Sequence, residues 1–299
     1  MSDGLRFGET KTKHISEVLI KTFNVIEERN KGKEPPDLDT GFDDLDAVIS
    51  GLKKGEVVVV AGRPTMGKTA FALNMANNVA QFYNKPAIIF SLVMDSEEIA
   101  IRLLSRSAEI ERMHLQSGKL SKTEQQNCSS AIARLRDIKL YVHFDPNLTF
   151  TDLKTACNQI ALDGGETPGL IVFDYLQLLV DENATNKVEE LSRYIREFKK
   201  LAMDLKCPII LLSQVPREVE NRQNKRPLLS DLRQSGNIEQ DADRVLMLYR
   251  DEQYNLDTPD RGLAEVGVVK NQHGSNGIIK LLFEPQFTKF KNLTEPLEY

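Results

Sequence analysis

The stretch Gly62–Thr69, with the sequence GRPTMGKT, limits the possible folds of this chain more than any other segment. A strand-like run, Glu56–Ala61, comes before it, and a helical pattern, Lys68–Phe82, begins inside it. The spacing G-x-x-x-x-G-K-T between a strand and a helix is that of a phosphate-binding loop. Its glycines let backbone N–H groups close around phosphate oxygens, and the helix N-terminus adds its positive end. The sequence therefore predicts nucleotide binding.

Two positions of this loop have specific expected roles. Lys68 is expected to reach the β- and γ-phosphates, and the Thr69 hydroxyl is expected to bind Mg²⁺. The residues predicted to bind the nucleotide here are Gly62, Arg63, Pro64, Thr65, Met66, Gly67, Lys68 and Thr69.

Two other strand-like runs end in polar side chains. Asp174 closes the apolar run of GLIVFDYLQLL, which matches a carboxylate oriented toward Mg²⁺; the alternative is an aspartate that begins an ordinary turn. Gln214 ends PIILLSQ, where an amide can sense the γ-phosphate; the alternative is a solvated turn residue. We predict Lys68, Thr69, Asp174 and Gln214 as the catalytic set, with Thr69 and Asp174 at the metal.

Strand-like and helical stretches alternate from Gly41 onward. The expected strands are Glu56–Ala61, Ala87–Leu92, Leu140–His143, Leu170–Asp174, Pro208–Ser213, Arg244–Tyr249, Glu265–Lys270 and Ile278–Phe283. The expected helices are Lys68–Phe82, Ser96–Ser107, Thr123–Arg136, Phe150–Leu162 and Val188–Leu205. Because continuous apolar strands alternate with helices, we predict an α/β fold with a mainly parallel central sheet and helices on both faces. The last strands follow one another through turns, which favours an antiparallel extension.

The N-terminal segment has a different character. Residues 1–13 are expected to be disordered, and apolar residues then recur at helical spacing across 14–30. Residues 31–40 read as a polar linker that contains two prolines. An amphipathic helix on a linker must bury its apolar stripe, either on its own domain or on a neighbouring subunit.

The composition limits where in the cell the protein is expected and which partners it can bind. Cys128, Cys157 and Cys207 stand at spacings that give neither a disulfide framework nor a zinc pattern, so we expect a cytoplasmic protein. No apolar run approaches the roughly 18 residues needed to cross a bilayer, and no membrane contact is expected. The net charge of −5 argues against a globally basic surface, so any contact with nucleic acid must come from a local patch.

One such patch is the polar segment from Val215 to Gly236. It carries five basic residues against three acids. Arginines and backbone N–H groups in loops suit contacts with phosphodiesters, which position a strand without reading its sequence. Aromatic side chains are absent from the segment, so base stacking is not indicated. The alternative is a mixed-charge loop that is only solvated.

Seven ordered motifs closely resemble one family. They are TGFDDLD (Thr40–Asp46), GRPTMGKTAFALNMA (Gly62–Ala76), FSLVM (Phe90–Met94), DYLQLL (Asp174–Leu179), LLSQ (Leu211–Gln214), NKRPLLSDLRQSGNIEQDAD (Asn224–Asp243) and YRD (Tyr249–Asp251). The pattern, from near His14 to Phe290, is similar to the C-terminal RecA-like motor domain of replicative, DnaB-type hexameric helicases. The resemblance implies a RecA-like P-loop NTPase domain over residues 41–290, followed by a tail, 291–299.

The resemblance also implies ligands and partners. It implies ATP and Mg²⁺, a further nucleotide-binding residue at Lys270, and a ring, expected to be a hexamer, on single-stranded DNA. The residues expected to bind DNA are Arg217, Arg222, Arg226, Arg233, Gln234 and Gly236. In this family the linker helix docks on the adjacent protomer, which favours that alternative for residues 14–30. The other partners implied are a primase, a helicase loader or another replicative helicase.

Three positions depart from the family pattern. Val93 stands where the family has the glutamate that polarises the attacking water, and Gln272 stands where it has an arginine finger for the neighbour's ATP. Gln234 replaces a glutamate. A general base contributes about 10²–10⁴ in rate and an arginine finger about 10³–10⁵, so losing both would weaken hydrolysis while sparing binding. The candidates to replace them are Asp95, Glu97 and Glu98 for the base, and Lys270 and His273 for the charge.

Two hypotheses for the function follow. The first is an ATP-driven replicative DNA helicase motor that translocates on single-stranded DNA and unwinds duplex DNA. The second is a hydrolysis-poor ATP-binding homologue that assembles with, loads or inhibits a true replicative helicase. The nucleotide-binding motifs support both hypotheses, whereas Val93 and Gln272 favour the second.

Overall fold

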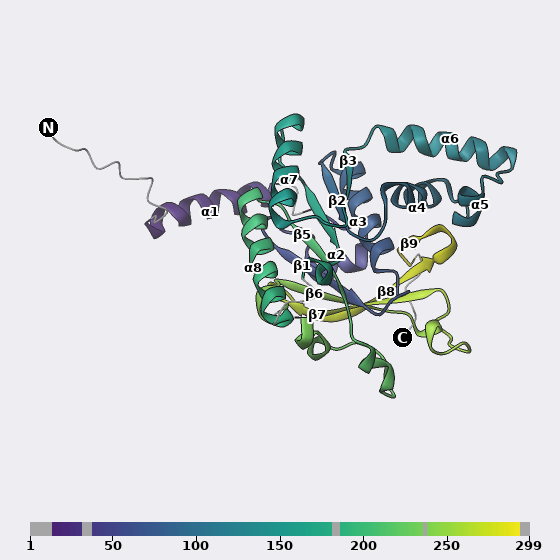
Figure 1. The fold of residues 1–299 in the computed structure, drawn as a ribbon. Helices are drawn as coiled ribbons and strands as arrows, with labels where there is room; N and C mark the ends of the chain where they lie inside the picture. Colours follow the sequence, from purple (N-terminus) through teal and green to yellow (C-terminus); the bar gives the residue numbers. More distant parts are fainter. Residues whose placement is uncertain (1–13, 32–37, 181–185, 236–237, 294–299) are drawn as a thin grey trace. The chain divides into compact units, whose positions relative to one another are not determined.

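The computed structural model describes residues 14–31, 38–180, 186–235 and 238–293 (Figure 1). The chain divides into two compact units, Met1–Asp37 and Leu38–Tyr299. The first unit contains the helix α1 (Ile15–Asn30), and most of its large apolar side chains are exposed. The expected disorder of residues 1–13 lies outside the described residues, as do residues 32–37 of the predicted linker and 294–299 of the predicted tail.

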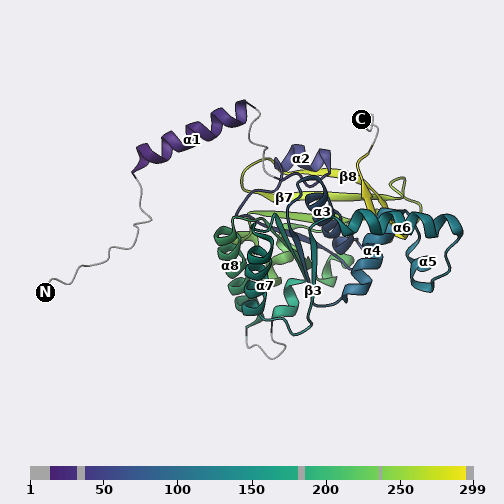
Figure 2. The same cartoon turned by 90° about the horizontal axis from the view of Figure 1, so that it is seen from above.

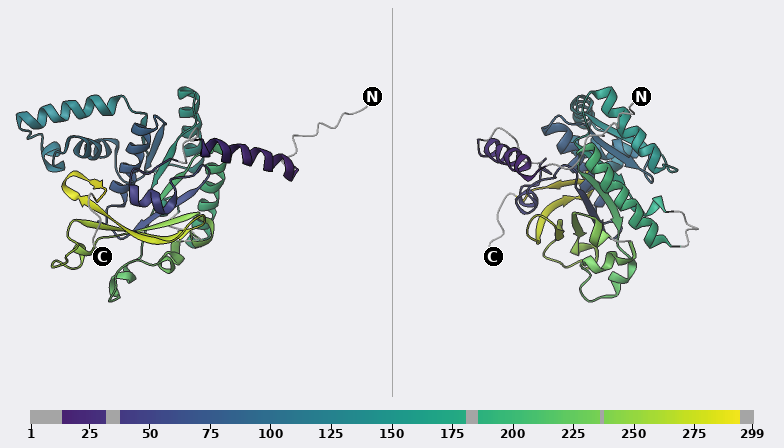
Figure 3. Two further views of the ribbon diagram at one scale, coloured as in Figure 1. Left: turned by 180° about the vertical axis from the view of Figure 1, so that it is seen from behind. Right: turned by 90° about the vertical axis from the view of Figure 1, so that its left-hand side faces the viewer.

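The second unit is built on a sheet of nine strands in the order β3-β2-β4-β5-β1-β6-β7-β8-β9. Their bounds are β1 (Val57–Gly62), β2 (Ala87–Ser91), β3 (Leu140–Phe144), β4 (Leu170–Asp174), β5 (Ile209–Gln214), β6 (Arg244–Tyr249), β7 (Leu263–Asn271), β8 (Gly277–Glu284) and β9 (Lys289–Lys291). Strands β3 to β6 in this order are parallel, and β7, β8 and β9 extend the sheet antiparallel (Figure 3). The predicted mainly parallel sheet with an antiparallel extension is confirmed.

Helices cover both faces of this sheet, as predicted. Their bounds are α2 (Asp43–Ile49), α3 (Lys68–Phe82), α4 (Ser96–Ala108), α5 (Arg112–Ser117), α6 (Lys122–Arg136), α7 (Phe150–Gly164), α8 (Lys187–Leu205) and α9 (Ile238–Asp241). Alternate residues of β1 enter opposite cores: Val58 and Val60 pack with residues of α2, α3 and α4, and Val57 and Val59 pack with residues of α7 and α8. Figure 2 shows α7 and α8 on one side of the strands and α2 and α3 on the other.

Short elements account for most of what the sequence pattern missed. The helices α2, α5 and α9 and the three-residue strand β9 were not predicted. Each spans seven residues or fewer. Such segments are too short for the repeated pattern from which a helix or strand is recognised, so pairing and packing decide their conformation. Within the described residues, no helix combines the length and apolar character that a bilayer crossing requires.

Candidate functional site

The phosphate loop lies where β1 ends and α3 begins. Gly67 has a φ of 96°, in the left-handed region that favours glycine. A Cβ added there would lie 3.1 Å from Phe290 Cζ and 3.3 Å from Phe283 Cζ. The motif's second glycine is therefore required by both backbone conformation and the aromatic side chains behind the loop.

The Lys68 ammonium group is folded against the loop backbone. Its Nζ donates hydrogen bonds to the carbonyl oxygens of Gly62 (2.9 Å) and Arg63 (3.0 Å). Burial lowers the pKa of Lys68 to about 8, and the nearby Asp174 carboxylate opposes that shift. The loop thus holds a partly buried lysine whose hydrogen bonds are made to the loop's own carbonyl groups.

Thr69 and Asp174 meet at the sheet edge. Thr69 Oγ1 donates to Asp174 Oδ2 at 2.7 Å, and Asp174 is only 6% exposed. Burial raises the pKa of Asp174, while the Thr69 hydrogen bond and the charges of Lys68 and Arg102 act against the increase. These hard oxygen donors fit Mg²⁺, which commonly takes one or two protein ligands together with substrate phosphates. Among the described residues, no cluster of three or more His, Cys, Asp or Glu side chains is arranged to hold a metal ion.

A cavity of about 650 Å³ joins the predicted residues. Lys68, Thr69, Asp174 and Gln214 all line it, although they come from three different parts of the chain. Of the remaining loop residues, Pro64, Thr65 and Gly67 also line it. The cavity therefore brings the predicted catalytic set together.

Gln214 is held in the cavity wall by a neighbouring amide. Its backbone N–H donates to Gln177 Oε1 at 3.3 Å, and Gln177 Nε2 donates to Ser213 Oγ at 2.8 Å. The Gln177 side chain thus links the segment after β4 to the end of β5.

The side chains of Arg63 and Met66 make contacts that hold the phosphate loop in place, and neither residue lines the cavity. Arg63 donates from Nε to Glu220 Oε1 (2.8 Å) and from Nη1 to the Val215 carbonyl (2.9 Å). Met66 is buried, and its sulfur accepts from the backbone N–H of Arg250 at 3.3 Å. The Arg63 contacts join the phosphate loop to the start of the polar segment 215–236.

Val93 lines the cavity and is 56% exposed. Of the carboxylates considered as replacements for a base, Asp95 caps α4 by accepting from the Glu98 N–H at 2.8 Å. Glu98 is itself bound to Arg102 Nη2 at 2.8 Å. None of Asp95, Glu97 and Glu98 lines the cavity, whereas Val93 does.

The cavity is also lined by three arginines that the sequence analysis did not assign to the site: Arg102, Arg112 and Arg250. Arg250 is fixed by the Thr65 carbonyl at 2.9 Å, by Glu252 and by the ring of Phe283. Its place in the YRD motif was a signal that could have suggested a role. Arg102 and Arg112 lie in α4 and α5 and fall in no motif that points to phosphate.

Lys270 and Gln272 do not line this cavity. Lys270 Nζ donates to the carbonyl oxygens of Ala242 (2.5 Å) and Gln240 (3.3 Å), and the Gln272 backbone N–H donates to the Asp243 carbonyl at 3.1 Å. Asp243 comes immediately before β6, so this region lies at the amino ends of the parallel strands. The phosphate loop follows the carboxyl end of β1, at the opposite edge of the sheet.

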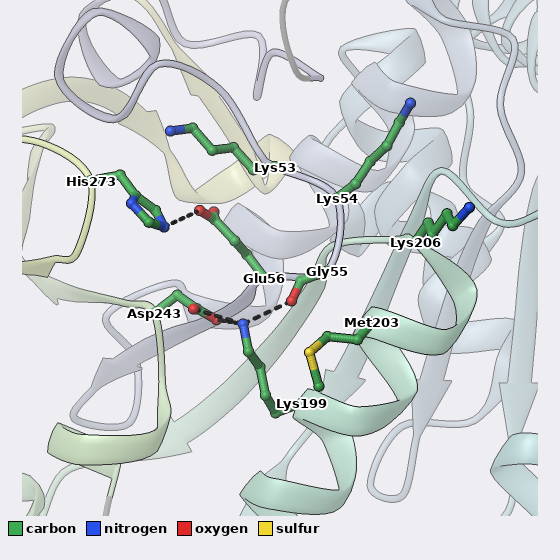
Figure 4. Close-up of a pocket in the computed structure, with 9 residues that line it drawn as sticks. All are labelled: Lys53, Lys54, Gly55, Glu56, Lys199, Met203, Lys206, Asp243 and His273. Carbon is green, nitrogen blue, oxygen red and sulfur yellow. Dashed lines mark hydrogen bonds and ion pairs between the residues drawn. The ribbon is translucent and has the colours of Figure 1, made fainter. Parts of the chain in front are cut away.

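A second pocket, of about 380 Å³, opens at that edge (Figure 4). Lys199 Nζ binds both Asp243 carboxylate oxygens at 2.7 Å, and His273 Nε2 lies 3.6 Å from Glu56 Oε1. Figure 4 shows Lys53 extending away from these pairs. His273 therefore lies at the opposite edge of the sheet from the cavity of its own chain.

The predicted DNA-binding residues differ in their surroundings. Arg217 is exposed, in the turn Arg217–Asn221. Arg222 binds the Asp231 carboxylate at 2.8 and 3.0 Å, and Arg226 binds Glu265 through two contacts of 2.7 Å. The backbone of Arg233 and Gln234 lies in the turn Leu229–Ser235, and Gly236 lies outside the described residues.

Comparison with known proteins gives consistent results. The family described as "DnaB-like helicase C terminal domain" matches residues 37–292. The chain is 38% identical over 284 residues to "Replicative DNA helicase DnaB" of Geobacillus stearothermophilus, covering 94% of this chain and 62% of that protein. It is 45% identical over 229 residues to the protein of the same name from Nostoc sp., covering 77% of this chain and 26% of that protein. The chain thus spans less than two thirds of the length of these curated relatives.

Solved structures agree with the sequence comparison. One structure, described as an "ATPase Domain", superposes with a TM-score of 0.86 at 31% identity, covering 95% of this chain and all of that chain. A second, described as "The Structure Of A DnaB-Like Replicative Helicase And Its Interactions With Primase", superposes with a TM-score of 0.83 at 31% identity, covering 95% of this chain and 68% of that chain. The fold of this chain is therefore the fold of these solved structures.

Proposed function

The chain belongs to the DnaB-like helicase C-terminal domain family, and from that membership we propose that it is the ATP-driven motor of a replicative DNA helicase. Its fold is RecA-like, as the neighbouring structures show. The motor would translocate on single-stranded DNA and unwind duplex DNA during replication. The observation that carries the proposal is the cavity that unites Lys68, Thr69, Asp174 and Gln214.

Each of these side chains has a proposed task. Lys68 exchanges its hydrogen bonds with loop carbonyls for contacts with the β- and γ-phosphates of ATP. Thr69 and Asp174 hold Mg²⁺, which neutralises charge on the phosphates when bound. Gln214, at the end of β5, connects the terminal phosphate with the polar segment that follows it. The loop backbone from Gly62 to Thr69 completes the phosphate site.

The polar segment 215–236 is proposed to contact single-stranded DNA. Arg222 and Arg226 have their guanidinium groups bound by carboxylates, so we assign them to holding the segment in shape. Arg217, Arg233, Gln234 and Gly236 are the proposed contacts with the DNA backbone. Phosphate contacts of this kind position a strand without reading its sequence.

Self-association into a ring, expected to be a hexamer, is the proposed assembly. The helix α1 leaves large apolar side chains exposed, among them Leu19 (59%) and Phe23 (59%). We propose that residues 14–30 act as a linker helix that covers this stripe on a neighbouring copy. Residues 31–40 would be its linker, 41–290 the motor domain and 291–299 a tail. In such a ring, Lys270 and His273 would lie near the nucleotide of an adjacent copy rather than their own.

Further partners are proposed from the relatives. One related structure is described by its interactions with primase. We propose a primase, a helicase loader or another replicative helicase as partners of this chain. A cytoplasmic location fits this role, and all three cysteines are free.

Steady-state ATP hydrolysis, with and without single-stranded DNA, tests the proposal. The motor predicts DNA-stimulated turnover that Lys68→Ala abolishes, because the substitution removes the charge from the phosphate site. The matched control is Lys53→Ala, which removes the same charge from the far edge of the sheet. Turnover in the wild-type protein no faster than in Lys68→Ala would overturn the motor proposal.

Val93 favours the second candidate function, because an apolar side chain faces the cavity where a general base would be useful. Under that hypothesis the chain binds ATP, hydrolyses it poorly, and assembles with, loads or inhibits a complete replicative helicase. Mixing experiments separate the two: a motor unwinds duplex DNA alone, whereas a modulator changes only the unwinding rate of its partner.

A further inference from the structure

We propose that Arg102 is a catalytic residue that supplies positive charge, within the same chain, to the phosphates of the bound nucleotide. The inference rests on the proposed hydrolysis of ATP and deepens it by naming a residue of that site. In the reaction, a water oxygen bonds to the γ-phosphorus while the bond to the ADP oxygen breaks. ADP and phosphate leave, and one proton passes to solvent. Negative charge develops on the transferred group and the leaving oxygen, where a nearby cation is most effective.

The sheet register brings Arg102 to this place. Strands β2 and β4 pair in parallel with Ser91 opposite Asp174, so both strands end at the same edge. The helix α4 begins five residues after Ser91, with Asp95 as its N-cap. Arg102 lies on the second turn of this helix and lines the same cavity as Lys68, Thr69 and Asp174. Arg102 and Asp174 therefore face a shared cavity from two neighbouring strand ends.

The Arg102 guanidinium group is anchored by one hydrogen bond, and another of its nitrogens has no hydrogen-bond partner. Its Nη2 donates to Glu98 Oε1 at 2.8 Å, one turn earlier on α4. Its Nε is buried and has no hydrogen-bond partner, although a guanidinium group carries five N–H donors. The backbone carbonyl of Arg102 accepts from Thr288 Oγ1 at 3.2 Å, which fixes the helix against the far wall of the cavity. Glu98 is 39% exposed at its side chain, so solvent screens its attraction for the arginine.

The other cations near the reaction are less suited to this task. Arg250 is committed to Glu252, the Thr65 carbonyl and the Phe283 ring. Lys270 and His273 lie at the opposite edge of the sheet, so neither can reach the cavity of its own chain. Where an arginine finger acts, its contribution to rate is about 10³–10⁵, and in some nucleotide hydrolases it is supplied in cis. Among the arginines that line the cavity, Arg102 is the one with a buried donor, its Nε, that has no hydrogen-bond partner.

The first experiment compares hydrolysis and binding in Arg102 variants. We expect Arg102→Ala to lower kcat at least 100-fold while the affinity for ADP with Mg²⁺ changes less than fivefold. Arg102→Lys should retain an intermediate kcat because it keeps the charge but loses the fork geometry. The affinity for ADP with aluminium fluoride, which mimics the transferred phosphoryl group, should fall in Arg102→Ala far more than the affinity for ADP alone. The control Arg136→Ala removes an exposed charge from α6.

Each outcome decides between specific alternatives. Unchanged hydrolysis in Arg102→Ala overturns this inference and leaves the motor proposal intact. Equal losses of affinity for ADP and for ADP with aluminium fluoride also overturn it, because they show a structural or ground-state role. If the wild-type chain binds ATP without hydrolysing it, the motor proposal and this inference fall together. Glu98→Gln, which leaves Arg102 in place, provides a second variant if Arg102→Ala does not fold; its kcat should fall about tenfold, and an unchanged kcat would then overturn the inference.

A mixing experiment tests whether the charge acts in cis. Lys68→Ala chains keep Arg102 but lose the phosphate-site lysine, whereas Arg102→Ala chains keep the phosphate site. If Arg102 acts in its own chain, mixtures of the two variants stay as inactive as each alone. Recovery of hydrolysis in the mixture would show that Arg102 acts on a neighbour's nucleotide, and would overturn the assignment.

Discussion

Val93 lines the cavity and stands where the family pattern has a glutamate. We expect Val93→Glu to increase kcat for ATP hydrolysis by about 10², the lower end of what general-base assistance contributes. The side chain is 56% exposed, so the added carboxylate needs no buried partner. Val93→Gln is the matched control, because it has the same length but cannot accept a proton. Equal rates in the two variants would contradict a base at this position.

Asp46 is a second residue whose ionisation has a measurable effect. Its carboxylate accepts from the backbone N–H groups of Thr40 (2.8 Å) and Gly41 (3.1 Å), yet burial raises its pKa to about 6. Between pH 3.8 and about 6, the folded protein therefore binds this proton more readily than the unfolded chain does. The corresponding contribution to the free energy of unfolding is greatest below pH 3.8 and is lost as pH rises through 6.

Asp46→Asn removes this titration. Urea unfolding at several pH values between 4 and 7 should show a smaller decrease in the free energy of unfolding with rising pH than in the wild type. Asp44→Asn, at an exposed position of the same helix, should leave the pH dependence unchanged. An identical slope in Asp46→Asn and wild type would show that the Asp46 proton is not linked to folding.

The proposed catalytic residues illustrate what a sequence can and cannot predict at this scale. Lys68, Thr69 and Asp174 were predicted because each stands at a fixed point of a motif or at the end of an apolar run. Arg102 could not be predicted, because its approach to Asp174 depends on the pairing of Ser91 with that residue across 83 positions of the chain. Lys270 was expected in the nucleotide site, and the structure places it at the opposite edge of the sheet from its own cavity.

The same distinction holds for whole elements. The strands that form the parallel part of the sheet were predicted within one or two residues, because all of them except β3 contain an uninterrupted apolar run of at least four residues. The short strand β9 exists because Phe283 pairs with Phe290 beside the phosphate loop, a contact that no local pattern contains. The turn Arg217–Asn221 was expected as loop, and it is a 3₁₀ turn tied to the phosphate loop by Arg63 and Glu220.

The segment 215–236 gives a prediction at the scale of an element. Arg217 is exposed and Arg222 is bound to Asp231, so only the first should neutralise a DNA phosphate. Arg217→Ala should weaken binding to single-stranded oligonucleotides and reduce the slope of log affinity against log salt by about 0.7. Arg136→Ala, which removes an exposed arginine outside this segment, serves as the matched control and should leave that slope unchanged. Fluorescence anisotropy at several salt concentrations measures both, and equal slopes in wild type and Arg217→Ala would exclude the contact.

Assembly is a property of the whole molecule. If the apolar side chains of α1 are covered by a neighbouring copy, charges placed among them should separate the copies. We expect the double variant Leu19→Asp, Phe23→Asp to sediment as a monomer at concentrations where the wild type is oligomeric. Lys21→Glu changes charge at an exposed position of the same helix, and we expect it to remain oligomeric. Oligomers of unchanged size in the double variant would show that another surface holds the ring together.

The central place of β1 in the sheet also determines when the nucleotide site can form during synthesis. Val57 pairs with Ile209 and Val58 pairs with Arg244, so β1 leaves the ribosome about 150 residues before its first neighbour exists. At translation rates of about 5–20 residues per second, that interval is roughly 8–30 seconds. During this time the strand is an apolar segment without a partner, and the phosphate loop behind it has no sheet to hold it. A nascent chain of this protein therefore depends on protection of β1 until β5 emerges.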